Sequence, residues 1–256
     1  MSAHSYFGGK SSDGHYHQII NLIPPHSNYI ELFGGKLGIY RHKKPAFRTL
    51  VVEKDETLAP YYDSLNFTRF VELDNFTRHL HAPFPVKAYY IGDAFDVLEY
   101  CVNDFDHDSN FIYIDPPYPL DSRKSQRPVY RYEFDNLQHQ VLCKYLKAFS
   151  LANIAISTYA NEIYNEEFLG LEHWTTCEVA AQTRQGRVTE QLWMNYATPQ
   201  ELHDYQYLGA NYREREDIQR KQKRWLKNFS NLPLLERRAM YEVLAAAIPN
   251  PTDNHG

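Results

Sequence analysis

The segment that most constrains the fold of this chain is Phe111-Ile112-Tyr113-Ile114-Asp115-Pro116-Pro117-Tyr118. Its first four residues are apolar or aromatic, a pattern typical of a strand in a parallel sheet that is covered on both sides. The two prolines end this strand, because proline cannot donate a hydrogen bond to a β-ladder and fixes its own φ near about −65°. Asp115 and Tyr118 are therefore expected just beyond the carboxyl end of the strand, where open α/β sheets bind ligands.

The residues beyond this strand suit chemistry at an exocyclic amine. Such an amine on a nucleobase is a poor nucleophile, because its lone pair is delocalised into the ring. The carboxylate of Asp115 and the backbone carbonyl of Pro116 could both accept from the amine and direct its lone pair toward an electrophile, while Tyr118 could stack on the base. The alternative is a strand-ending turn with a tyrosine that packs, and the surrounding sequence has to decide between the two.

Strand-length apolar runs alternate with helical periodicity along most of the 256 residues. This alternation predicts an α/β fold with a doubly wound, mostly parallel, Rossmann-like sheet. We expect strands at 28–32, 48–53, 88–91, 111–114 and 154–157, and a β-hairpin from 174–182 and 188–196. We expect helices at 15–23, from the glycine-rich turn to Pro45, and at 56–80, 93–102, 135–149, 212–229 and from Pro233 onward. The predicted domains are a catalytic domain over 1–198 and a small helical C-terminal extension over 199–256.

Three further signals follow predicted strands in order. The turn Phe33-Gly34-Gly35-Lys36-Leu37-Gly38 carries glycines that would let the backbone approach a ligand closely. Glu31 ends the first strand and Glu53 ends the second, where an acid commonly hydrogen-bonds ribose hydroxyls in nucleotide-binding folds. Asp93, in Gly92-Asp93-Ala94, follows the next strand and could accept from an adenine amino group. Each is a turn glycine or a solvated acid when taken alone, but their order places all of them at one edge of the sheet.

These motifs together resemble the Dam-type DNA methyltransferases, which transfer a methyl group from S-adenosylmethionine to adenine N6. The resemblance covers about residues 5–197. It includes the leading Phe7-Gly8-Gly9-Lys10, the Asp-Pro-Pro-Tyr motif, and the later run from Thr189 to Tyr196. The resemblance implies a methyltransferase-type sheet, S-adenosylmethionine as the cofactor, DNA as the partner, and contacts from Phe7 and Lys10 to the methionine part of the cofactor.

The resemblance assigns roles to two groups of residues. The implied catalytic residues are Asp115, Pro116, Pro117 and Tyr118. The implied cofactor-binding residues are Phe7, Lys10, Glu31, Phe33, Gly35, Glu53, Asp93 and Ala94. A restriction or defence-system partner is compatible with the resemblance, which says nothing of the oligomeric state.

One departure from the family pattern keeps alternatives open. Lys36 and Leu37 interrupt the glycines of the first turn, and Leu37 stands where the family has a glycine beside the methionine moiety. A side chain there would crowd the cofactor, which motivates a degenerate, non-catalytic binder of cofactor or DNA as one alternative. A methyltransferase acting on RNA or on a protein amide is the other, since related Pro-Pro-Tyr motifs serve those substrates.

Nucleic-acid contacts must come from local basic segments, because the formal net charge is −5. The loop 119–131 leaves the catalytic motif directly, and a second basic point is the tip of the predicted hairpin. The predicted DNA-binding residues are Arg123, Lys124, Arg127, Arg131, Arg184 and Arg187. The charged helix 212–229 is an additional candidate, with a structural or partner-docking role as its alternative.

The remaining composition indicates an ordinary intracellular protein. The 3 cysteines lie far apart without CxxC spacing, which indicates packing residues in a reducing compartment. The 12 histidines have no accompanying cysteine pairs or HExxH motif, so we expect no metal. No signal peptide or long apolar segment is apparent, and we predict a cytoplasmic protein without a membrane partner.

Overall fold

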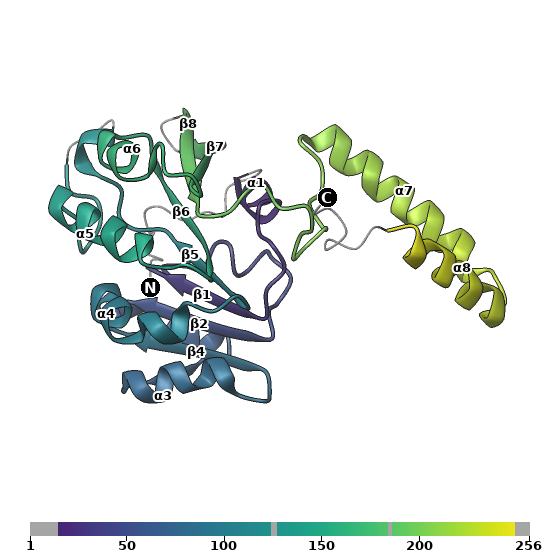
Figure 1. Cartoon of the computed structure of the whole chain (residues 1–256), viewed down its shortest axis with the longest axis horizontal. Helices are drawn as coiled ribbons and strands as arrows, with labels where there is room; N and C mark the ends of the chain where they lie inside the picture. Colours follow the sequence, from purple (N-terminus) through teal and green to yellow (C-terminus); the bar gives the residue numbers. More distant parts are fainter. Residues whose placement is uncertain (1–14, 124–126, 184–185, 249–256) are drawn as a thin grey trace. The chain divides into compact units, whose positions relative to one another are not determined.

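A computed structural model describes residues 15–123, 127–183 and 186–248. Its strands form one eight-stranded sheet in the order β3-β4-β2-β1-β5-β6-β8-β7 (Figure 1). Neighbouring strands are parallel except at β8, which runs antiparallel to both β6 and β7. The strands are β1 Asn28–Leu32, β2 Arg48–Glu53, β3 Thr68–Phe70, β4 Val86–Ile91, β5 Asn110–Ile114, β6 Asn153–Tyr159, β7 Thr175–Thr183 and β8 Gly186–Met194.

Helices connect the parallel strands. The α-helices of the sheet-containing part are α1 His15–Ile20, α2 Ala59–Ser64, α3 Leu73–Arg78, α4 Ala94–Phe105, α5 Asn136–Lys147 and α6 Glu162–Phe168, and the 3₁₀ turns are η1 Glu56–Leu58, η2 His79–His81 and η3 Leu120–Ser122. The two longest of these helices begin at aspartate N-caps: Asp93 caps α4, and Asp135 forms a capping box with Gln138 in α5. Such caps satisfy amides that have no partner within the helix.

The sheet is covered on both faces, as a doubly wound fold requires. One face packs Ile30, Val52 and Ile112 against the apolar sides of α3, α4, α5 and α6. On the other face, Val51 and Tyr89 pack against α2 and the turn after β1. The strands at the centre are buried on both sides, which is why they occur in the sequence as continuous apolar runs.

The chain reverses its direction of winding between β1 and β5. The strands β1, β2 and β4 progress toward one edge of the sheet, whereas β5 and β6 lie on the other side of β1. Leu32, at the end of β1, is in register with Ile114 at the end of β5. The crevice at such a switch point, beyond the carboxyl ends of the strands, is where doubly wound sheets bind ligands.

The structure confirms the predicted α/β doubly wound sheet and its hairpin. The first two strands, 28–32 and 48–53, have the predicted bounds. Two helix predictions are wrong. Residues 36–45 form turns rather than a helix, and the stretch 56–80 is divided into η1, α2, β3 and α3 with part of η2. The strand β3 and the helix α6 add to the elements that the sequence predicts.

The described part of the chain divides between Asp204 and Tyr205 into two compact units. In the second unit α7, Tyr212–Ser230, begins at Asn211, whose side chain accepts from the backbone N–H of Glu214, and α8 spans Leu234–Ala246. Neither helix contains a buried residue. Within the ranges that the structure describes, no helix has both the length and the apolar character needed to cross a bilayer.

Candidate active site

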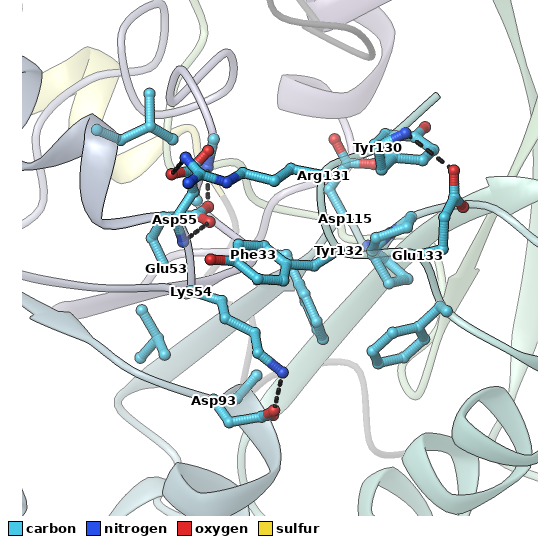
Figure 2. Close-up of a pocket in the computed structure, with 18 of the residues that line it drawn as sticks. Phe33, Glu53, Lys54, Asp55, Asp93, Asp115, Tyr130, Arg131, Tyr132 and Glu133 are labelled. Carbon is cyan, nitrogen blue, oxygen red and sulfur yellow. Dashed lines mark hydrogen bonds and ion pairs between the residues drawn. The ribbon is translucent and has the colours of Figure 1, made fainter. Parts of the chain in front are cut away.

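A cavity of about 670 Å³ lies at the switch point, within the usual size range of small-molecule sites. Its wall contains the end of β1, the glycine turn, the ends of β2 and β4, the residues after β5, and the segment 129–134. Figure 2 shows acidic, basic and aromatic side chains around this cavity. The structure therefore brings together the described residues that the sequence assigned to cofactor binding and three of the four assigned to catalysis: Glu31, Phe33, Gly35, Glu53, Asp93, Ala94, Asp115, Pro116 and Pro117.

The glycine turn is held by contacts from outside the cavity. The hydroxyl of Tyr62 donates to the carbonyl of Gly35 at 2.9 Å, and that of Tyr61 donates to the carbonyl of Lys36 at 3.0 Å. A Cβ atom on Gly34 would lie 2.5 Å from a methyl carbon of Val51, so glycine is required at that position for close packing. The backbone of the turn is thus fixed as one wall of the cavity.

Leu37 does not crowd this cavity, and the predicted obstruction is wrong. Its φ of 54° is left-handed, which turns the side chain into the apolar cluster around Val51, Tyr62 and Tyr89, where it is 0% exposed. The side chain of Leu37 lies outside the cavity wall, whereas its neighbours Lys36 and Gly38 are part of that wall. Leu37 therefore interrupts the run of glycines without entering the cavity, because its side chain packs in the core.

Glu53, at the end of β2, braces the turn and its own strand end. One carboxylate oxygen accepts from the backbone N–H of Gly35 at 2.8 Å, and the other accepts from that of Asp55 at 2.7 Å. Burial raises the pKa of Glu53, while these two hydrogen bonds oppose the rise. Each oxygen has a further lone pair, so the carboxylate can also accept from hydroxyl groups of a ligand.

Glu31 lines the cavity and also belongs to a buried polar cluster with Tyr29 and Lys43. Burial raises its pKa to about 8, against a hydrogen bond of 2.8 Å from the hydroxyl of Tyr29. Lys43 has a pKa lowered to about 7 by burial, with Glu31 opposing this change, and its ammonium group lies 4.2 Å over the ring of Tyr29. The cluster therefore gives the cavity wall a carboxyl group whose pKa is raised by burial.

Asp93 is the N-cap of α4 and faces the cavity. One carboxylate oxygen accepts from the backbone N–H of Phe95 at 3.0 Å, and the other accepts from the ammonium of Lys54 at 2.7 Å (Figure 2). Lys54 also lies over the ring of Tyr132, 5.5 Å from its centroid. A ligand that donates to Asp93 therefore competes with an exposed lysine.

Asp115 and the two prolines line the cavity together with Asp93, but Tyr118 does not. Tyr118 is 5% exposed, and its ring meets that of Tyr159 edge-on with centroids 4.5 Å apart. The stacking of Tyr118 on a base, which the sequence predicts, therefore stays a prediction, and the ring itself is buried against Tyr159. The ring would have to move away from Tyr159 before a base could stack on it.

The segment 129–134 forms the outer wall of the cavity. Tyr130, Tyr132 and Phe134 all line it, and Phe134 stacks on Phe95 and meets Phe33 edge-on, with centroids 5.3 Å apart in both pairs. The sequence prediction gave these aromatic residues no place in the cavity. All six residues from 129 to 134 line the cavity, so no alternation in the sequence marks these aromatic residues as part of it.

The basic residues after Tyr118 differ from the prediction. The side chain of Arg123 is only 6% exposed and is paired with Glu133 at 2.6 Å, whereas the sequence predicted a contact with DNA phosphates. Arg131 is 58% exposed but pairs with Asp55 at 2.8 Å, and both line the cavity (Figure 2). Arg127 is exposed. The predicted residues Phe7, Lys10, Lys124 and Arg184 lie outside the described residues, as does the side chain of Arg187.

No protein-family model and no curated protein matches the chain. Solved structures with a similar fold include SMU.776 complexed with SAH, at 16% identity over 70% of this chain and a TM-score of 0.44. The chain covers 47% of that protein's length. TomG from Streptomyces achromogenes, an O-methyltransferase in complex with SAM, is 12% identical over 71% of this chain and 78% of its own, with a TM-score of 0.43. The O-methyltransferase from Bacillus cereus in complex with SAH is 13% identical over 71% and 79%, with a TM-score of 0.41. These likenesses are too distant to say what this chain binds.

Proposed function

We propose that this chain is an S-adenosylmethionine-dependent methyltransferase that methylates adenine N6 in DNA. The observation that carries the proposal is the shared wall of one cavity. Asp115, Pro116 and Pro117 line the same cavity as the glycine turn and the acids Glu53 and Asp93. A nucleoside cofactor and a reactive amine would then meet beyond the carboxyl ends of the strands.

The residues around the cavity fit the nucleoside part of the cofactor. Glu53 can accept from ribose hydroxyls, because each of its oxygens has a lone pair beyond its bond to the backbone. Asp93 can accept from an adenine amino group once Lys54 moves aside. Phe33, Tyr132 and Phe134 offer ring faces and edges to the purine.

The methionine part of the cofactor can lie beside Glu31, which lines the same cavity. S-adenosylmethionine carries a positive sulfonium and an ammonium, and Glu31 offers a carboxyl group to them. A cation would stabilise the ionised form of Glu31 and lower its raised pKa. We therefore propose that Glu31 binds the cofactor as a carboxylate and that binding releases a proton from it.

When bound, S-adenosylmethionine would supply an electrophilic methyl group: as the amine nitrogen bonds to the methyl carbon, the carbon–sulfur bond breaks, the sulfur keeps the electron pair as a neutral thioether, and the amine releases one proton. The chain's own contribution is to orient the amine. The carboxylate of Asp115 and the carbonyl of Pro116 accept its two N–H groups, which frees the nitrogen lone pair to point at the methyl carbon. Because both acceptors are fixed at the end of a buried strand, most of the rate enhancement would come from positioning and preorganised dipoles.

The target base has to leave the DNA duplex to reach Asp115. We propose that Tyr118 rotates away from Tyr159 and stacks on the flipped adenine. DNA phosphates would be contacted by the exposed Arg127 and by α7, which carries seven lysine and arginine residues against three acids. Arg123, enclosed by the protein, takes no part in this contact.

The decisive experiment measures methyl transfer from labelled S-adenosylmethionine to unmethylated DNA, to RNA and to protein. We expect label in DNA only, recovered as N6-methyladenine after digestion to nucleosides. Asp115→Ala is expected to lower kcat by about 100-fold or more while cofactor affinity stays within a few fold. Label in RNA or protein would replace the substrate proposed here. Cofactor binding without transfer to any substrate would favour the degenerate binder.

A further inference from the structure

The ion pair between Arg123 and Glu133 links the catalytic motif to the outer wall of the cavity. The guanidinium donates through Nε to the backbone carbonyl of Tyr118 at 2.7 Å, and its Nη2 also donates to that carbonyl. On the other side, Nη1 and Nη2 donate to the two carboxylate oxygens of Glu133 at 3.1 and 2.6 Å. One planar side chain therefore ties Tyr118 to residue 133.

Glu133 in turn holds the wall segment. Its Oε1 accepts from the backbone N–H groups of Val129 at 2.6 Å and of Tyr130 at 2.9 Å. Burial acts to raise the pKa of Glu133, but the hydrogen bonds from Arg123 and the two amides outweigh it and lower the pKa. The two oxygens of this carboxylate accept four hydrogen bonds from protein groups, although Glu133 lines the cavity.

The guanidinium also covers a residue of the cavity. Its central carbon lies 4.7 Å from the centroid of the Tyr130 ring, and Tyr130 lines the cavity. The side chain of Arg123 is 6% exposed and that of Glu133 is 22% exposed, so both are largely shielded from water. Because removing one partner of such a pair leaves the other shielded and unsatisfied, the two residues act as a unit.

We propose that Arg123 and Glu133 are positioning residues that fix Tyr118 relative to the cofactor-binding wall. The methyl donor and the target base would be held by different segments, and this pair is the connection between those segments. Neither residue touches the reacting atoms. The assignment to methyl transfer rests on the proposed function, whereas the mechanical link from Tyr118 to residues 129–133 does not.

A lysine substitution separates positioning from simple stabilisation. Arg123→Lys keeps the positive charge but loses the planar guanidinium group, whose N–H groups donate to Tyr118 and Glu133 at the same time. We expect kcat to fall about 10–100-fold, because small misplacements of a catalytic group have effects of this order. The KM for DNA and the fraction of folded protein are expected to stay near wild type. Arg78→Ala, which removes an arginine from α3 outside the cavity wall, is the matched control and is expected to leave kcat unchanged.

The charge swap Arg123→Glu with Glu133→Arg is the sharper test. It restores an ion pair, but a glutamate at 123 cannot donate to the Tyr118 carbonyl, and an arginine at 133 cannot accept from the amides of Val129 and Tyr130. We expect kcat to remain low even where the swapped protein is folded. Recovery of wild-type kcat in the swap, or wild-type kcat in Arg123→Lys, would overturn the proposal.

The same variants distinguish this role from the phosphate contact that the sequence predicted. A phosphate contact predicts that Arg123→Lys leaves kcat intact and that Arg123→Ala lowers DNA affinity and its salt dependence instead. Hydrogen exchange without any ligand gives a readout that does not need methyl transfer. We expect faster exchange at the amides of Val129 and Tyr130 in Glu133→Ala, and unchanged exchange would refute the link itself. If wild-type protein transfers no methyl group, the proposed function fails while this measurement still decides the link.

Discussion

Leu37 offers the clearest test of the site geometry, because sequence and structure give it opposite roles. The sequence suggests that Leu37 crowds the cofactor, so that Leu37→Gly should tighten binding. The structure places the side chain in the core, 0% exposed, beside Val51 and Tyr62. In this position Leu37→Ala is expected to lower the free energy of unfolding by about 2–5 kcal/mol, which is typical of buried leucines.

Leu37→Gly is expected to destabilise the fold by a similar amount. Glycine relieves the left-handed backbone, where φ is 54° and an L-residue is strained by about 1–2 kcal/mol. Removal of one further methyl group, worth about 0.8 kcal/mol, and the added chain entropy, about 0.5–1 kcal/mol, offset this gain. The alanine and glycine variants should therefore differ by no more than about 1 kcal/mol from each other.

Urea denaturation measures the stabilities, and calorimetry with S-adenosylmethionine measures the affinities. Both Leu37 variants are expected to bind the cofactor as wild type does under conditions where they are folded. Lys36→Ala is the matched control, since Lys36 is in the same turn but lines the cavity; its stability is expected to be unchanged. A Leu37→Gly protein that is as stable as wild type and binds more tightly would refute the placement of Leu37 in the core.

Three other predictions concern the site and α7. Asp93→Ala is expected to weaken cofactor binding by about 1–3 kcal/mol. Lys54→Ala, which frees the same carboxylate, is expected to leave the cofactor affinity unchanged or to increase it. Calorimetry measures both affinities, and a loss of affinity in both variants would contradict this prediction. Glu31 has a pKa of about 8 in the folded chain, against an ordinary value of 4.5. Between pH 4.5 and pH 8 the folded chain therefore keeps a proton on Glu31 that the unfolded chain has released. This proton binding stabilises the folded chain at low pH, and the stabilisation disappears as the pH rises. The unfolding free energy of Glu31→Gln relative to wild type is therefore expected to increase from pH 5 to pH 8, and a constant difference would argue against a buried, protonated Glu31. Finally, each phosphate contact removed from α7 is expected to reduce the magnitude of the slope of log DNA affinity against log salt concentration by about 0.9. A triple alanine variant of Arg213, Arg224 and Lys227 should therefore lower this slope more than Arg127→Ala does. An unchanged slope in the triple variant would exclude α7 from the DNA contact.

The order of amino acids specifies the alternation of strands and helices and the edge of the sheet at which the site lies. The run from Phe111 to Ile114 is apolar on both faces, as a covered parallel strand requires, and the prolines after Asp115 fix where it ends. Once strands and helices alternate, the residues after each parallel strand must meet at one edge. Glu53, Asp93 and Asp115 could therefore be grouped from the amino-acid order alone, although they are far apart in the chain.

The directions of individual side chains, in contrast, depend on tertiary contacts. The sequence predicted that Leu37 obstructs the cavity, because it stands among glycines. Its left-handed backbone, which turns the side chain into the core, cannot be inferred from the pattern of glycines. Arg123 looked like a phosphate ligand because its basic loop is polar in sequence, yet Glu133, ten residues later, binds its guanidinium within the protein. The pattern of strands and helices determines at which edge of the sheet a loop lies. The partner of a charged side chain in that loop depends on how the loop folds back on itself.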